Sequence, residues 1–328
     1  MSNVITIFKS NMTRIKEKKV IIVMSVVVIP IMIMLAVFFT GREESKLNVA
    51  LVSENINQIE SNKAFHIIGL DKKPAMSDLL LNKYDAIVEK EGDNTYVVTS
   101  IKSIKNKEKI EAYFNSGILA EETNKDESGV GQNILGYISM FVLLEGINLM
   151  TLYSDDKKNK TFRRELITTA NIRQYLFAHC LFTFVFIYLP TYFALVITKL
   201  VFRVEIAYSL WTLSGLLAIL AALSTGFALF IASAIKKQDD GVLASSLIII
   251  VTSILSGCFY SFTIKNKIMD TITGIIPQKA FLTLSNGLDS GKGIGEYPKQ
   301  LIYLCFCIIL FWVLGGIISK RNVNKGLY

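Results

Sequence analysis

Six long apolar stretches dominate the sequence, and together they contain a single Asp, Glu, Lys or Arg. Each has at least twenty residues, and they cover 20–41, 128–154, 174–198, 206–235, 241–263 and 300–319. Because an α-helix rises about 1.5 Å per residue, some twenty residues cross the ~30 Å hydrocarbon core of a bilayer. Soluble cores do not place six such segments in one chain. The fold class we expect is therefore an α-helical polytopic membrane protein with six transmembrane helices.

The basic residues indicate how these spans are oriented. The segments 1–19, 155–173 and 320–328, with the turn between the fourth and fifth spans, hold 16 Lys and Arg, whereas the short segments on the opposite side hold 7. Short cytoplasmic loops carry such an excess, so both termini are expected in the cytoplasm. The net charge of +8 is then an orientation signal and not a nucleic-acid footprint. The first apolar stretch exceeds the usual core of a signal peptide, and we interpret it as an uncleaved span.

The long segment 42–127 is expected outside the cell as a small mixed α/β domain. Residues 47–53, 65–70, 84–89 and 95–101 have the composition of strands, the last two forming a hairpin. Residues 74–82 and 105–119 are expected to be helical. Ligand binding and a purely structural spacer role are both compatible with this pattern.

Two further segments have amphipathic patterns. In the N-terminal segment 1–19, apolar residues recur at helical spacing, which suggests a helix lying on the inner leaflet; they are Val4, Phe8, Met12 and Ile15. In the outer segment 264–299, isoleucines at every fourth position lead to Pro277, and a second stripe follows. We expect two short helices that dip into the outer leaflet, with a plain surface loop as the alternative.

Enzymatic motifs are nearly absent. With two histidines, His66 and His179, the chain cannot hold an H-E-x-x-H zinc site, and we expect no metal site and no catalytic residue. The four cysteines lie in apolar stretches and are read as small packing residues. No cytoplasmic segment is long enough for a nucleotide-binding domain. Any ATP hydrolysis would therefore belong to another chain.

Glu145 is the one carboxylate inside a predicted span. A charge there costs a few kcal/mol, so such a residue usually faces the bundle interior or a wet cavity. It could contact a cation or a cationic substrate, relay protons, or make a structural hydrogen bond in its neutral form. His179 is expected at a wet interfacial position near the cytoplasmic end of its span.

The cytoplasmic segment 155–173 is highly charged. Thr161 is a candidate N-cap for a short helix, in which Phe162 and Leu166 would share one face beside a basic flank. The pattern favours a helix presented to a partner, with a solvated loop as the alternative.

The order of these segments resembles the permease subunits of ABC-2 type ABC transporters, which have the type V exporter fold. The loop after the second span in that family reads as an acidic residue, basic residues, Gly-Thr and then x-x-Arg-Leu, and Asp155, Thr161 and Arg164 stand at matching positions. The chain departs from this pattern at Lys160, Glu165, Ala170 and Ala178-His179. Residues 256–260, which end in Phe259 and Tyr260, and the later Pro277 are similar to the family's outer segment.

The resemblance implies a coupling helix that docks on a cytoplasmic ABC ATPase. Its residues here would be Asp155, Thr161, Phe162, Arg163, Arg164 and Leu166. A tentative substrate pathway would use Glu145, Phe259, Tyr260 and Pro277. Also implied are a second permease subunit, identical or related, contact with membrane lipid, and ATP with Mg²⁺ bound by the partner ATPase and not by this chain.

The expected function is export of an amphipathic or hydrophobic substrate, with an antimicrobial peptide or drug favoured, across a bacterial plasma membrane. Within the family, sodium extrusion and lipid or glycan export are alternatives. From other classes, we retain a membrane sensor with an outer ligand-binding domain, and an intramembrane enzyme that uses Glu145 and His179.

Overall fold

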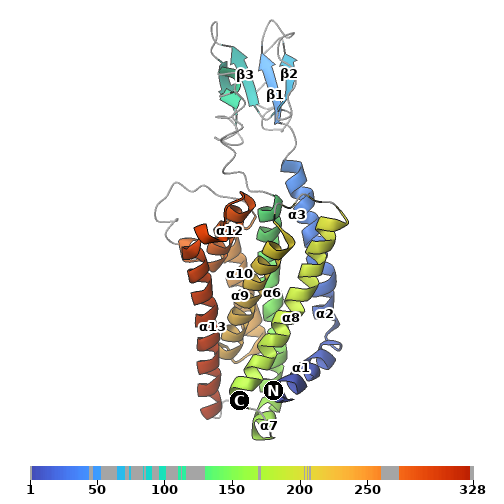
Figure 1. Cartoon of the computed structure of the whole chain (residues 1–328), viewed down its shortest axis with the longest axis vertical. Helices are drawn as coiled ribbons and strands as arrows, with labels where there is room; N and C mark the ends of the chain where they lie inside the picture. The colour runs from blue at the N-terminus through green and yellow to red at the C-terminus, as the bar shows by residue number, and fades with distance from the viewer. Residues whose placement is uncertain are drawn as a thin grey trace. The chain divides into compact units, whose positions relative to one another are not determined.

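The computed structural model of the chain describes residues 2–43, 47–52, 65–70, 74, 84, 86–90, 96–100, 110–111, 113–115, 130–168, 171–202, 204, 206, 208–259 and 273–325. These fall into two compact units. One is a helical bundle formed by Met1–Thr40 and Ser128–Tyr328, and the other comprises Gly41–Glu127. Each unit is described by itself (Figure 1).

Long apolar helices form the bundle. In chain order the α-helices are α1 (Ser2–Ile15), α2 (Lys19–Val23), α3 (Ile29–Glu43), α6 (Val130–Lys158), α7 (Thr161–Thr168), α8 (Ile172–Leu200), α9 (Leu210–Ala234), α10 (Gln238–Ser256), α12 (Pro277–Asp289) and α13 (Pro298–Asn324). Candidate membrane spans within the described residues are Asn133–Lys158, Ile172–Leu200, Leu210–Ala234, Gln238–Ser256 and Pro298–Asn324. The chain is therefore a mostly helical, polytopic membrane protein.

The first predicted span is divided. A π-helical segment, η1 (Met24–Val28), separates α2 from α3, and the apolar part of α3 covers only Ile29–Phe38. A π turn widens the helix by one residue and occurs most often at functional sites. The sequence does not indicate this interruption, since the residues of η1, Met-Ser-Val-Val-Val, continue the apolar composition of the segments on either side.

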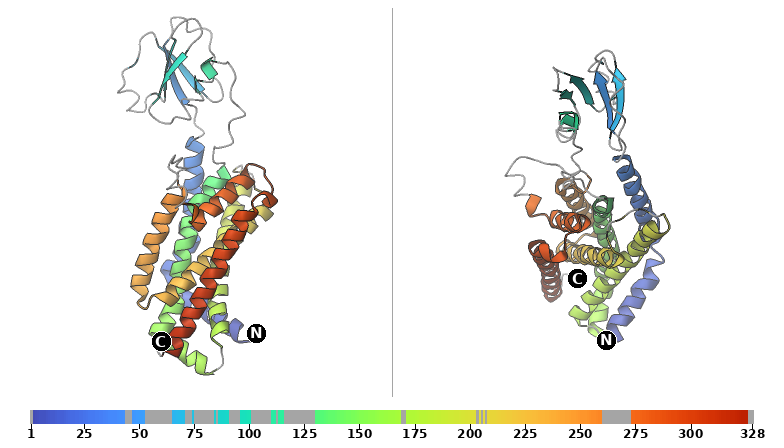
Figure 2. Two further views of the ribbon diagram at one scale, coloured as in Figure 1. Left: turned by 90° about the vertical axis from the view of Figure 1, so that its left-hand side faces the viewer. Right: turned by 45° about the horizontal axis from the view of Figure 1, so that its top comes forward.

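Helix α9 packs most extensively on α6 and α13, and Figure 2 shows it among the other helices of the bundle. Glycines permit this close approach. A Cβ at Gly146 of α6 would come within 2.1 Å of Ser224 Oγ, and one at Gly315 of α13 within 2.9 Å of Leu229. The Ser224 hydroxyl donates to the Val142 carbonyl at 2.8 Å, which ties α9 to α6.

The segment between α10 and α13 contains α12, whose first residue is Pro277, and a 3₁₀ turn at Ile294–Glu296. Pro at the first helical position has no N–H to leave unpaired. The first of the two predicted outer helices falls largely on residues 260–272, which lie outside the described part of the chain.

The second unit contains a four-stranded sheet with the order β2-β1-β3-β4. Its strands are β1 (Leu47–Val52), β2 (Phe65–Leu70), β3 (Ala86–Lys90) and β4 (Tyr96–Thr99), so all four predicted strands are present. β1 pairs in parallel with β2 and β3, while β3 and β4 are antiparallel. Residues 110–111 and 113–115 are helical, and Ile110 and Phe114 cover one sheet face. Of the helix predicted at 74–82, only Pro74 is described.

Candidate functional site

The short polar helix α7 lies between α6 and α8, and several charged groups of α1, α6 and α8 meet beside it; we call this region the α7 end. Lys160 precedes the helix with a φ of 57°, and its carbonyl accepts the first helical hydrogen bond, from Arg164 N at 3.3 Å. Lys160 is thus the N-cap, and the N-cap prediction for Thr161 was wrong by one residue. The left-handed conformation explains why the family pattern has glycine here, because glycine adopts it without a steric cost.

Phe162 holds α7 against the bundle. Its side chain is fully buried. The centroid of its ring lies 5.6 Å from that of Tyr153 of α6 and 4.8 Å from that of Tyr175 of α8. The Tyr153 hydroxyl in turn lies 2.7 Å from Ser319 Oγ of α13. Phe162 therefore faces inward and is an anchor of α7, not part of its outer surface.

The other predicted coupling residues have different environments. Arg163 and Arg164 are exposed on α7, and Arg164 Nη2 donates to Thr161 Oγ1 at 3.4 Å. Asp155 pairs with Lys18, with 2.5 Å between Oδ2 and Nζ. The side chain of Leu166 lies outside the described part. Of the predicted coupling residues, Arg163 and Arg164 are thus the ones whose described side chains are exposed.

Asp156 is the centre of a buried polar cluster. Arg14 of α1 reaches its carboxylate with two nitrogens, Nη2 at 2.8 Å from Oδ1 and Nη1 at 2.9 Å from Oδ2. Tyr175 OH donates to Oδ2 at 2.5 Å, and His179 Nε2 lies 3.3 Å from the same oxygen. Burial alone would lower the pKa of Arg14, but the hydrogen bond and charge of Asp156 outweigh it and raise that pKa. The Arg14 guanidinium therefore stays positively charged at any ordinary pH.

His179 completes the cluster. Asn11 Oδ1 accepts from Arg14 Nη1 at 3.4 Å, so the amide nitrogen of Asn11 faces His179 Nδ1, at 3.2 Å. Nδ1 is then an acceptor, and the ring proton is on Nε2 toward Asp156. The expectation of a wet position for His179 was wrong: it is 2% exposed. Asn11, which the apolar pattern of α1 did not indicate, is also buried, because its partner lies on α8.

Lys157 and Asn322 connect α9 to its neighbours at the same end. Lys157 Nζ donates to the carbonyl of Ala232 and lies 5.0 Å from the centroid of the Tyr153 ring. Asn322 Nδ2 of α13 donates to the Ser233 carbonyl at 3.2 Å. The last carbonyls of a helix have no hydrogen-bond donor within the helix. Here side chains of α6 and α13 donate to two of them. Through residues 153–157, α6 thus contacts α1, α8, α9 and α13.

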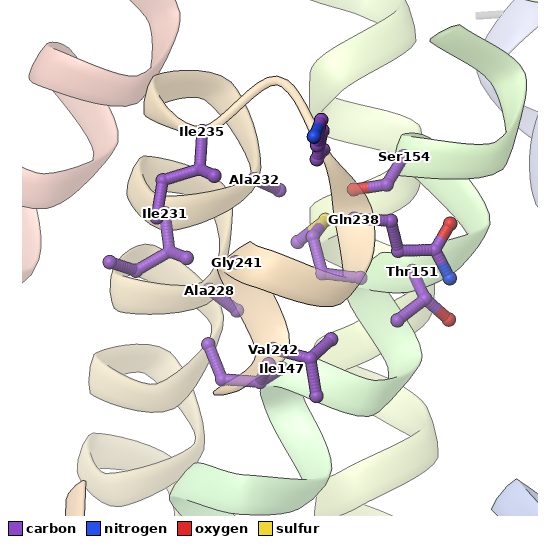
Figure 3. Close-up of a pocket in the computed structure, with 12 residues that line it drawn as sticks. Ile147, Thr151, Ser154, Ala228, Ile231, Ala232, Ile235, Gln238, Gly241 and Val242 are labelled. Carbon is purple, nitrogen blue, oxygen red and sulfur yellow. The ribbon is translucent and has the colours of Figure 1, made fainter. Parts of the chain in front are cut away.

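A small pocket lies at the α7 end between α6, α9 and α10 (Figure 3). Its polar lining includes Thr151, Ser154, Lys237 and Gln238, and the remaining lining residues are mostly apolar. The start of α10, at Gln238, Gly241 and Val242, forms one wall of it.

The structure does not bring the predicted pathway residues together. Glu145 is in the middle of α6, whereas Phe259 packs on Tyr137 of the same helix, with 5.2 Å between centroids. Eight helical residues separate Tyr137 from Glu145, about 12 Å along the axis. Pro277 begins α12, and Tyr260 lies outside the described residues.

Glu145 and His179 are also apart. His179 pairs with Asp156, eleven residues and about 16 Å along α6 from Glu145. An intramembrane active site built from these two groups is therefore not formed.

Sequence reasoning selected Asp155 and missed its neighbour Asp156, together with Asn11, Arg14 and Tyr175. A signal was present. Two consecutive acids directly follow an apolar span and precede a run of basic residues, which is an unusual place for negative charge unless it has a specific partner.

These features define a multi-pass membrane protein whose short polar helix is held between two spans by a buried ionic and aromatic cluster. The chain belongs to the ABC-2 family of transporters: the family model described as ABC-2 family transporter protein matches residues 18–317. A search of curated proteins found no match. Membership makes this chain the membrane component, or permease subunit, of an ABC transporter, which associates with an ABC ATPase and has no ATPase site of its own.

Proposed function

We propose that this permease exports an amphipathic or hydrophobic substrate and that α7 is the helix on which its ATPase docks. The observation that supports this proposal is that α7 has one buried face and one exposed basic face. Phe162 is buried against α6 and α8, while Arg163 and Arg164 face outward. A helix fixed on one face and basic on the other suits an electrostatic contact with a second protein.

In this proposal, movement of α7 reaches the membrane through the cluster around Asp156. ATP, bound with Mg²⁺ by the partner, would close the ATPase subunits and displace α7. Tyr153, Asp156 and Lys157 join that end of α6 to four other helices, so the spans move as connected bodies. Transport then requires that the substrate bind the inward-open and outward-open states with different affinity.

The arrangement in the membrane is also part of the proposal. The excess of basic residues supports an orientation in which the α7 end lies in the cytoplasm and Gly41–Glu127 outside. α2, η1 and α3 together would form the first of six spans, because continuous helix runs over Lys19–Glu43. Two permeases, identical or related, would pair with two ATPases in a bacterial plasma membrane.

An antimicrobial peptide or drug remains the favoured cargo, in a resistance or self-protection role. Sodium, lipid and glycan are alternative cargoes. A sensor role is less well supported, because a ligand signal would need to pass through many spans that the sensing itself does not require.

The test is co-purification with candidate ABC ATPases from the same genome, beginning with any encoded beside this gene. Reversal of an exposed charge at an interface costs on the order of 1 kcal/mol, or about fivefold in affinity. We expect Arg164→Glu to weaken ATPase binding by about that factor, and Arg163→Glu with Arg164→Glu to weaken it further. Lys320→Glu, at an exposed lysine near the end of α13, is the matched control. Equal binding by all variants would remove α7 as the docking helix.

A further inference from the structure

Glu145 is buried in the middle of α6 without a settled partner. Its side chain is 3% exposed. Among the residues that the structure describes, neither carboxyl oxygen has a hydrogen bond of regular geometry. An ionised carboxylate left unpaired in an apolar interior costs several kcal/mol, so such groups are rare in membranes and usually serve a substrate or ion.

The side chain of Ser25 interacts with this carboxyl. Ser25 is fully buried and lies within the π-helical segment η1. The Ser25 hydroxyl is itself directed at the Phe186 carbonyl of α8, at 3.4 Å. Glu145 therefore faces the one place where the first helical segment departs from α-helical geometry. Two independent features, an unsatisfied carboxyl and a widened turn, meet at one point.

From this juxtaposition we propose that Glu145 is the cation-binding group of the permease and selects cargo with a positively charged, lipophilic head. When empty, it is a neutral carboxylic acid in contact with Ser25. When the cation enters, the O–H bond breaks, the proton leaves to water, and the carboxylate pairs with the cation. The site is thus neutral before and after loading. That this cation is the transported cargo rests on the proposed function, but cation binding by the carboxyl group can be measured without transport.

The π segment supplies a way to make room. Conversion of a π turn to α-helix shifts the register by one residue and rotates the preceding helix by about 100°. That rotation would carry Ser25 away from Glu145. The preceding helices are α2 and α1, and α1 is bound to the α7 end by Arg14 and Asn11. Displacement of α7 therefore has a connected path to this site.

No other charge competes for the cation at this depth in the part of the chain that the structure describes. α9 and η1 contain no Asp, Glu, Lys, Arg or His. In the elements packed on α6, the charged residues lie away from the middle of the spans. They are Lys19 on α2, Arg163 and Arg164 on α7, Arg173, His179 and Lys199 on α8, Asp239 and Asp240 on α10, and Lys279 and Asp289 on α12, with Asp155, Asp156, Lys157 and Lys158 at the end of α6 itself. Asp156 is about 16 Å from Glu145 along α6.

The test uses the purified full-length permease and dicyclohexylcarbodiimide, which reacts with protonated carboxyls in apolar surroundings. The carboxyl oxygen adds to the central carbon, its proton passes to nitrogen, and an acyl shift leaves a stable N-acylurea. Adducts at Glu145 are counted by peptide mass spectrometry, with Glu145→Gln as the blank. We expect labelling of the wild-type protein at neutral pH.

Two lipophilic ions of matched shape then probe selectivity. Tetraphenylphosphonium should slow labelling of Glu145 at least tenfold at saturation, whereas tetraphenylborate should leave it unchanged. One proton is released for each cation bound. The tetraphenylphosphonium concentration that gives half protection should therefore fall about tenfold for each unit by which the pH is raised, while the empty site stays protonated. Ser25→Ala, which keeps the carboxyl, should still be labelled and protected.

Absence of labelling, or equal effects of the two ions, would overturn the proposal. Both measurements are made on the permease alone. If tetraphenylphosphonium protects Glu145 but the permease binds no ATPase, the proposed docking is refuted and this inference stands. If the permease binds its ATPase but Glu145 is not protected, this inference is refuted and the proposed docking stands.

Discussion

Arg14 and Asp156 form a two-point ion pair, with Nη2 at 2.8 Å from Oδ1 and Nη1 at 2.9 Å from Oδ2. They are 142 residues apart in the chain. The guanidinium is partly exposed, at 30%, and the carboxylate is buried, at 4%. α1 is therefore fixed to the end of α6 by a contact whose acidic partner cannot easily return to water. The pair joins the N-terminal helix to the region that carries α7.

Arg14→Gln leaves the buried Asp156 carboxylate without its cation. Removing one partner of a buried pair costs about 3–5 kcal/mol, and partial exposure of Arg14 reduces this to about 2 kcal/mol. We expect a lower midpoint of thermal unfolding in detergent than for the wild type. Lys16→Gln, at an exposed lysine directly after the same helix, should be close to neutral. Equal midpoints for the two variants would contradict the role of the pair.

The partner substitution gives a second check on the same contact. Arg14→Gln combined with Asp156→Asn leaves neither charge unpaired, so the double variant should be more stable than the sum of the single losses predicts. Contacting residues usually show a coupling of 0.5–3 kcal/mol, on the order of 1 kcal/mol here. Strict additivity would mean that the pair contributes nothing.

Asn11 should hold α1 to α8 through His179. Asn11→Leu keeps the volume but leaves His179 Nδ1 buried without its donor, at a cost of about 1–3 kcal/mol. Because the loss is local, α1 should detach before the bundle unfolds. We expect faster tryptic cleavage at Lys9 and Arg14 than in the wild type, with little change in global unfolding. Asn11→Asp is not a suitable control, since it adds a charge; Thr13→Ala, which removes only an exposed hydroxyl, is the appropriate one.

Phe162 is expected to act as an anchor and not as a docking residue. Phe162→Ala removes the ring from between Tyr153 and Tyr175, and large-to-small changes at buried Phe cost about 3–5 kcal/mol. α7 should then show faster amide hydrogen exchange, with weaker ATPase binding as a consequence. Phe162→Leu, which refills most of the space, should restore both. If Phe162→Ala weakened ATPase binding without any change in exchange, Phe162 would have to contact the partner directly.

The main features of the fold could be predicted from the sequence, and the cluster at the α7 end could not. Uncharged length alone indicated the spans, and alternation with turn residues indicated the four strands. Hydropathy does not say which polar side chain of an amphipathic helix meets a buried partner, however, so Asn11 of α1 was not identified. The pairing of Asp156 with Arg14 and His179 depends on how three distant helices dock. Glu145 was identifiable because charge inside a span is costly, but its π-helical neighbour was not, since η1 has an ordinary apolar sequence.

Lys160 is the residue at which sequence pattern and backbone disagree, and it gives the last prediction. Its φ of 57° costs a residue with a Cβ about 1–2 kcal/mol, and the family pattern has glycine at this position. Lys160→Gly should therefore stabilise the start of α7 by about 1 kcal/mol, seen as slower exchange of the α7 amides. Lys160→Val, a β-branched residue that disfavours this conformation more strongly, should have the opposite effect. Lys160→Ala keeps the Cβ and removes the charge, so it should match the wild type, because the side chain is exposed. A gain for Lys160→Ala equal to that for Lys160→Gly would assign the effect to charge and not to backbone conformation.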